Sequence, residues 1–189
     1  MPAVPVWPGC HPYDPVPVQF SCDAGDGRDR LAHHEWIAPD ASDPRPELVR
    51  RIAAACRGAR AIVAYNASFE TRCLRLIGAA LPQLRGSIED ICSRIRDALP
   101  VVRDHVYHPD FGGGFGLKTV LPALVPELSY AGLEIAEGNV ASVHLARLLF
   151  EPDRMTGEEA ERLRADLLRY CALDTLGLAR LLARLRELA

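Results

Sequence analysis

The sequence is poor in the features that mark a nucleic-acid-binding or membrane protein. Lys118 is its single lysine and the formal net charge is -3, so the molecule as a whole lacks the basic surface that attracts nucleic acid. No apolar run is long enough to span a bilayer, and no basic segment followed by an apolar run marks a secretory signal. These absences predict a cytoplasmic protein with no membrane partner, in which any nucleic-acid site is a local patch.

Paired cysteine motifs are also missing. The six cysteines include no Cys-x-x-Cys pair, and most lie within apolar stretches. This distribution is typical of reduced core cysteines in a cytosolic protein, and it argues against a zinc site. Apolar residues at 49% and charged residues at 25% are ordinary for a globular protein, and the length suits a single domain over residues 1–189.

The stretch AIVAYNASFETRCL, residues 61–74, changes from a strand pattern to a helical one. Its first four residues are apolar and too few for a helix, which predicts a strand buried on both faces. Helical spacing follows Asn66, so Asn66 or Ser68 is suited to cap a helix, and Glu70 falls in the first turn, where the helix dipole favours a carboxylate. A capped helix explains this stretch by itself. An anion at the carboxyl end of a buried strand is also where open α/β sheets place their chemistry.

Other segments have clear strand and helix signals. Residues 1–17 carry six prolines, which predicts an extended lead-in without a regular helix or central strand. Alternating stretches at 18–22 and 31–37 predict a hairpin closed by a glycine-containing turn. Apolar spacing and caps predict further helical segments over residues 44–57, 118–124 and 140–150, and from 156 onward. Residues 87–99 are predicted to form a helix or a junction between a helix and a strand.

Tyr170 and Asp174 lie four residues apart in the last predicted helix, so the phenol and the carboxylate share one face. Thr156 and Glu159 form a capping box that opens this helix. The neighbours of the pair form a long apolar stripe, and polar tips beside such a stripe need an explanation. Taken alone, the pair is weak evidence for a site.

The longest irregular region, residues 104–116, ends in a glycine-rich run before Lys118. It does not match a phosphate-binding P-loop, because Leu117 stands where that motif requires glycine and no buried strand precedes it. Lys118 and Tyr107 are suited to contact a phosphate and a base of a single strand. A mobile, solvated loop explains the same composition.

Two of these patterns together carry a resemblance to a known class. Asn-x-x-Phe-Glu at 66–70, followed by Tyr-x-x-x-Asp at 170–174, resembles the second and third motifs of the DEDD 3′-5′ exonucleases, in the variant with Tyr in the last motif. A longer set of phrases, in order, resembles the bacterial domain-of-unknown-function family 2779. These phrases lie at residues 12–13, 17–21, 43–45, 65–70, 107–111, 120–124 and 170–175.

The resemblance implies an α/β fold of RNase H-like type, with a mixed sheet flanked by helices. It also implies hydrolysis of DNA or RNA phosphodiesters with two Mg²⁺ or Mn²⁺ ions, for which carboxylates are suitable ligands. Asp174 and Glu70 would bind metal, Glu70 directly or through water. Tyr170 would orient the attacking water, because an ordinary tyrosine pKa of about 10 disfavours a general base.

The remaining site residues would act on the substrate or on the local fold. Asn66 would shape the turn before its helix and, with Lys118 and Tyr107, contact the substrate. Phe69 would pack in the core. Asp97, near the end of segment 87–99, either approaches the site in an RNase H-like layout or is a solvated end of an element.

The chain departs from the resemblance at its start. The family pattern implies a first strand with Asp-x-Glu, which carries two of four metal-binding carboxylates, upstream of the proline-rich segment. We therefore expect the chain to be part of a longer protein, often with an N-terminal nuclease-like region, and its sheet to lack the first strand. With Glu70 and Asp174 alone, we expect weak metal binding and slow or no cleavage. A non-catalytic module that binds nucleic acid or protein is an alternative, and so is a partner chain that supplies the missing strand.

Overall fold

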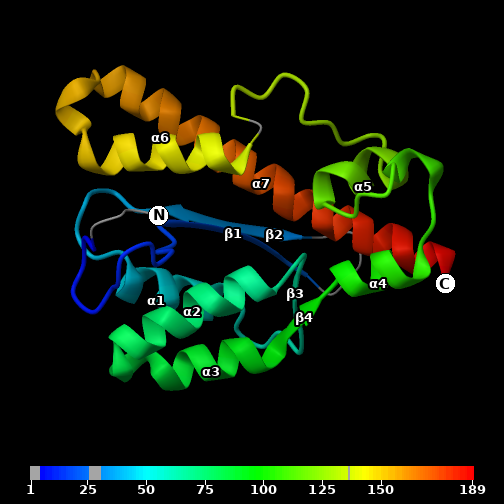
Figure 1. The fold of residues 1–189 in the computed structure, drawn as a ribbon, viewed down its shortest axis with the longest axis horizontal. Coiled ribbons are helices and arrows are strands. Elements are labelled where there is room, and N and C mark those ends of the chain that lie inside the picture. The colour runs from blue at the N-terminus through cyan, green and yellow to red at the C-terminus, as the bar shows by residue number, and fades with distance from the viewer. Residues whose placement is uncertain (1–4, 26–30, 136) are drawn as a thin grey trace.

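A computed structural model describes residues 5–25, 31–135 and 137–189, and Figure 1 shows an α/β arrangement. In chain order the elements are β1 (Gln19–Ala24), β2 (Ala32–Ile37), α1 (Arg45–Ala55), β3 (Ile62–Ala64), α2 (Ser68–Ala80), η1 (Pro82–Leu84), α3 (Arg85–Arg94), β4 (Ile95–Asp97), α4 (Leu99–His105), η2 (Pro109–Phe111), α5 (Leu117–Leu124), α6 (Gly138–Phe150), η3 (Pro152–Arg154) and α7 (Gly157–Leu188). β1 and β2 lie between two groups of helices, α1, α2 and α3 on one side and α6 and α7 on the other (Figure 1).

β1 and β2 form the predicted antiparallel hairpin, with Gln19 opposite Ile37 and Ala24 opposite Ala32. Part of the predicted turn falls on residues 26–30, outside the described residues. The pairing follows from the alternating pattern of the two stretches, because side chains on a strand alternate between its two faces. The hairpin is therefore the part of the fold that the sequence predicted most directly.

The two faces of the hairpin contact different helices. Phe20 packs into the apolar cluster formed with α1, α2 and α3. On the other face, Gln19 Nε2 donates a hydrogen bond of 2.8 Å to the backbone oxygen of Leu167 in α7. Ser21 Oγ lies 3.0 Å from Thr175 Oγ1, also in α7. The hairpin is thus held between α1 and α7.

β3 and β4 form a separate parallel pair, with Ile62 opposite Ile95 and Ala64 opposite Asp97. We expected one mixed sheet, but the four described strands form two sheets of two strands each. The expectation that β3 is buried on both faces is also wrong, since Val63 is 36% exposed. A strand of three residues with a single neighbour has too little around it to cover both faces.

The proline-rich lead-in is fixed to the fold by Arg45, at the start of α1. This side chain is 1% exposed. Its guanidinium donates to the backbone oxygen of Pro8 at 2.8 Å and to Asp43 Oδ2 at 2.7 Å. Trp7 Nε1 also donates to the backbone oxygen of Ala41 at 3.1 Å. As predicted, no helix or strand forms between residues 5 and 18, the described part of the lead-in.

Helices α1, α5, α6 and α7 agree with the sequence pattern to within a few residues, whereas α4 was not predicted. Segment 87–99 is a helix followed by a strand, as the pattern allowed. The capping box at the start of α7 is present, with Thr156 Oγ1 accepting from the Glu159 backbone N–H and Glu159 Oε2 accepting from the Thr156 N–H. Pro122 lies inside α5, which is only eight residues long.

Candidate functional site

α5 and α7 approach each other closely beside the predicted pair on α7. A Cβ atom added at Gly177 would lie 2.6 Å from Leu121 Cδ1, so the contact depends on glycine. Leu121 is 1% exposed and belongs to the apolar cluster under α5. This contact holds the first turn of α5, with Lys118, against the face of α7 that carries Tyr170 and Asp174.

Four side chains meet at this place, and we call them the Lys118 cluster: Lys118, Tyr130, Tyr170 and Asp174. Lys118 Nζ donates to Tyr170 Oη at 3.1 Å. The same ammonium lies 4.7 Å from the centroid of the Tyr170 ring and 5.2 Å from that of Tyr130, within the range of cation–π attraction. Tyr130 Oη donates to Asp174 Oδ1 at 2.6 Å. The cluster thus combines one cation, two phenols and one carboxylate.

Burial shifts the proton equilibria of this cluster. It raises the pKa of Asp174 above the ordinary 3.8, although the hydrogen bond from Tyr130 and the charge of Lys118 oppose the rise. Burial and then the charge of Asp174 raise the pKa of Tyr170, and burial and the hydrogen bond to Asp174 raise that of Tyr130. Both phenols therefore keep their protons at neutral pH. A protonated Tyr170 can donate a hydrogen bond, which the predicted orienting role needs, but it does not act as a base.

A second group of polar atoms lies at the carboxyl ends of β3 and β4. Asp97 Oδ1 accepts from the backbone N–H groups of Asn66 and Leu99, both at 2.9 Å, and Oδ2 accepts from that of Ala67 at 3.0 Å. Asn66 has a φ of 63°, a left-handed conformation that asparagine tolerates better than most residues. Asp97 therefore fixes the turn from β3 into α2.

The prediction that Asn66 or Ser68 caps α2 is wrong. The residue before the helix is Ala67, and no side chain caps from that position. Ser68 Oγ instead donates to Asn66 Oδ1 at 3.0 Å. The N–H groups before the helix are satisfied from a neighbouring strand, by the carboxylate of Asp97, which local sequence rules do not take into account.

Glu70 lies at an exposed position in the first turn of α2. Desolvation by nearby atoms raises the pKa of its carboxyl above the ordinary 4.5, and the negative charge of Asp97 adds to the rise. The groups that shift Asp174 are different ones, namely Tyr130, Lys118 and Tyr170. The structure thus brings Asp174 together with Tyr170 and Lys118, and it places Glu70 beside Asp97.

The residues present do not fit a two-metal centre. Within residues 5–25, 31–135 and 137–189, no group of three or more His, Cys, Asp or Glu side chains could hold a metal ion. The carboxyl groups of Glu70 and Asp174, predicted to bind metal together, are influenced by different neighbours, Asp97 for Glu70 and Tyr130, Lys118 and Tyr170 for Asp174. We therefore derive no reaction step through Mg²⁺ or Mn²⁺ for this chain alone.

Two of the aromatic side chains considered in the sequence analysis are exposed. Tyr107, between α4 and η2, is 89% exposed. Phe69 is 55% exposed, so the expectation that it packs in the core is wrong. The buried part of α2 begins at Cys73, and Phe69 lies in the first turn, beyond that part.

Sequence reasoning missed Tyr130. It lies between α5 and α6, in a segment with no periodic pattern, and it is one of five tyrosines. Its partner Asp174 is 44 residues away in the sequence. No local signal points to such a contact, so only the folded chain could reveal it.

These features define an α/β protein whose candidate site combines a lysine, two tyrosines and an aspartate on α5, α7 and the segment before α6. The chain belongs to the domain of unknown function family DUF2779, whose model matches residues 1–116. The matched part includes Asn66 and Glu70 and ends before α5. Neither the curated proteins nor the solved structures contain a match to the chain. None of the described helices combines the length and the apolar character needed to cross a membrane.

Proposed function

We propose that this chain is an RNase H-like domain related to the DEDD exonucleases, which by itself binds single-stranded DNA or RNA without hydrolysing it. The observation that carries the proposal is the Lys118 cluster, where the motif residues Tyr170 and Asp174 meet a lysine. Among the described residues, no group of three or more His, Cys, Asp or Glu side chains could hold a metal ion, which supports binding rather than catalysis. The α/β arrangement and the motif at 66–70 are compatible with the same origin.

The cluster offers a phosphate two hydrogen-bond donors at one place. Lys118 Nζ lies 3.1 Å from Tyr170 Oη, so a phosphate oxygen in contact with the ammonium is within reach of the phenol proton. The carboxylate of Asp174 is engaged by Tyr130, which limits its repulsion of an anion. Exposed Tyr107 provides an aromatic face for a neighbouring base, since stacking on aromatics suits single strands of any sequence.

Fluorescence anisotropy with labelled single-stranded DNA and RNA tests this function. Lys118→Ala is expected to reduce the salt dependence of binding by about 0.7 in the log–log slope, the value for one lost phosphate contact on a single strand. Tyr107→Ala is expected to weaken binding by roughly 1–3 kcal/mol through lost stacking. Arg57→Ala, which removes an exposed charge on the loop before β3, serves as the control.

A nuclease assay with Mg²⁺ or Mn²⁺ completes the test. We expect no cleavage by the wild-type chain. Robust metal-dependent cleavage that is lost in Tyr170→Phe and Asp174→Ala would contradict the proposal and support a working exonuclease. If neither DNA nor RNA binds, the nucleic-acid function is wrong, and the protein-docking alternative is favoured instead.

The open edges of the sheets favour a second proposal for catalysis. Within the described part of the chain, β1 and β3 each pair with one strand only, so each has one edge whose backbone groups lie outside a ladder. We propose that an acidic strand, from an N-terminal nuclease-like region or from a partner chain, adds to such an edge. It would supply the carboxylates that this chain lacks. Hydrogen exchange at the edge amides tests this proposal.

A further inference from the structure

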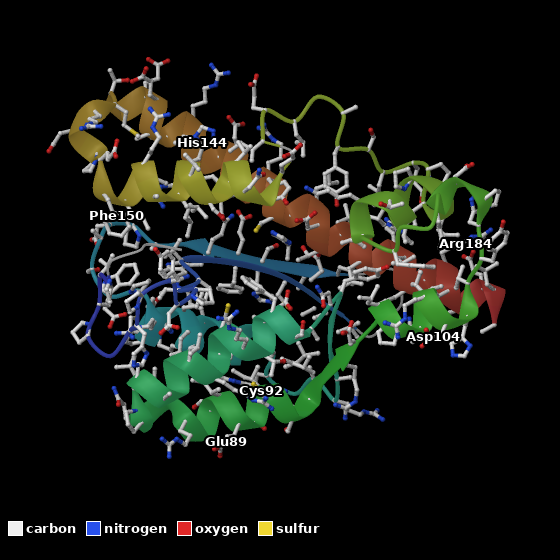
Figure 2. All side chains as sticks on the ribbon, in the orientation of Figure 1. Glu89, Cys92, Asp104, His144, Phe150 and Arg184 are labelled. Atoms are coloured by element: carbon white, nitrogen blue, oxygen red, sulfur yellow. The ribbon has the colours of Figure 1, made fainter. Side chains whose placement is uncertain are left out.

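A pocket of about 630 Å³ opens beside the first half of α2, separate from the Lys118 cluster. Its walls come from α2, from the end of α3 and from β4, with Cys92 on the α3 side. Figure 2 labels Cys92 where α3 runs along α2. The pocket also includes Asp97, at the carboxyl end of β4, and open α/β sheets bind ligands at such strand ends.

Two arginines give this pocket a positive charge. Arg72 and Arg75 are three residues apart on α2, so their side chains leave the same face of the helix, and both are exposed. The positive charge of Arg72 helps to lower the pKa of Asp14, and that of Arg75 opposes the burial that raises the pKa of Cys92. Among the described residues, however, neither guanidinium makes a hydrogen bond or an ion pair with another side chain. Their donors are therefore available to a ligand.

The acid in the pocket, Asp97, has its oxygens engaged by the backbone, and the two arginines outnumber it. Both oxygens of Asp97 accept hydrogen bonds from the backbone, three in all, from Asn66, Ala67 and Leu99. Thr71 also lines the pocket, one residue before Arg72, and brings a hydroxyl to the same face of α2. The open side of the pocket thus offers two guanidinium groups and a hydroxyl, which are typical ligands of a phosphate group.

We propose that this pocket binds a phosphate group of single-stranded nucleic acid, with Arg72, Arg75 and Thr71 as donors. The choice of nucleic acid as the source of the phosphate rests on the proposed function, whereas the preference for phosphate rests on the pocket. The pocket and the Lys118 cluster would then contact two different phosphates of one strand. This arrangement explains how a chain with a net charge of -3 binds a polyanion through local contacts.

The test compares two double variants that remove the same charge. Arg72→Ala/Arg75→Ala removes the pocket arginines, and Arg57→Ala/Arg60→Ala removes two exposed arginines on the loop before β3. We expect the first to weaken binding of a labelled single strand about tenfold and to reduce the salt slope by about 1.4, as two lost phosphate contacts predict. The second is expected to change both values much less. Arg72→Lys/Arg75→Lys keeps the charge without the paired donors and is expected to restore the salt slope but only part of the affinity.

The possible outcomes distinguish a failure of the pocket proposal from a failure of the proposed function. Equal losses in the two alanine variants would overturn the pocket, because charge alone would then explain the effect. Titration with inorganic phosphate provides a second arm. If the wild-type chain binds phosphate through Arg72 and Arg75 but binds no strand, the function is overturned and the anion site stands. Strands with and without a 5′-phosphate distinguish the source, since equal affinities indicate the backbone and a preference for the phosphorylated strand indicates its end.

Discussion

At the scale of single residues, the chemistry of the Tyr170 and Asp174 motif depends on side chains outside the motif, which form the rest of the Lys118 cluster. Tyr170 and Asp174 are recognisable by their spacing, yet the hydrogen bond that engages Asp174 comes from Tyr130. Lys118 was predicted as a phosphate contact at the start of a short helix after a flexible loop, and the structure places it in the first turn of α5 against Tyr170. The sequence thus indicated three of the four side chains, with Tyr170 and Asp174 on one helix face, but not that Lys118 and Tyr130 meet them.

The raised pKa of Asp174 predicts how stability depends on pH. The stabilising contribution of this group is fully present below the ordinary pKa of 3.8 and is lost as the pH rises through the folded value. Asn cannot ionise, so Asp174→Asn escapes this loss while it can still accept from Tyr130. We expect the free energy of unfolding of the wild type to fall, relative to that of the variant, as the pH is raised from about 4. Urea denaturation of both proteins at several pH values measures this difference in the free energy of unfolding.

The control for this prediction is Asp110→Asn, because the Asp110 side chain is 77% exposed. This substitution removes a carboxylate without changing the Lys118 cluster. If the free energies of unfolding of the wild type and Asp174→Asn change in parallel with pH, burial does not raise the pKa of Asp174 as the structure indicates.

At the scale of elements, local patterns predicted those helices and strands whose stability is encoded in their own sequence. The hairpin has alternating side chains, and α7 has a capping box and a long apolar stripe. The turn into α2 is different. Its backbone N–H groups are satisfied by Asp97, which comes close only because Ala64 pairs with Asp97 in the parallel ladder. The sequence gives no register for strands of three residues, so this contact could not be predicted.

Substitution of Asp97 tests this account of α2. Asp97→Ala is expected to reduce the free energy of unfolding by about 1–3 kcal/mol, because three backbone N–H groups lose their acceptor. Ser68→Ala, at the position predicted to be a cap, is expected to change it by less than about 0.5 kcal/mol. Chemical denaturation measures both. Equal effects would mean that Asp97 does not hold the start of the helix.

At the scale of the whole molecule, the fold contains two small sheets where the sequence pattern suggested one. The α/β class was predicted, and so were three of the four described strands, whereas for segment 87–99 both a helix and a helix followed by a strand were open. The separation of the sheets was not predicted, because pairing between distant strands depends on neighbours that composition and periodicity do not specify. Val63 shows the consequence, since an apolar strand residue is 36% exposed.

Hydrogen exchange measures whether the backbone amides at the open edges of β1 and β3 are unprotected. In the isolated chain, we expect rapid exchange of the β1 and β3 amides that point away from their single partner strands, because nothing in a ladder protects them. An added strand would slow that exchange. Light scattering on the same sample identifies a second copy by a mass above the 20.7 kDa of one chain. Protected edge amides in a sample of monomeric mass would rule out the strand-addition proposal.

The 32-residue α7 connects parts of the molecule that are far apart in sequence. Gln19 bonds to Leu167 across 148 positions, and Ser21 lies against Thr175 across 154. On the ribosome, the hairpin is therefore made long before the helix that covers its polar face emerges. Early in synthesis the hairpin has only its α1 side to fold against, so assembly of the domain must await the end of translation of α7.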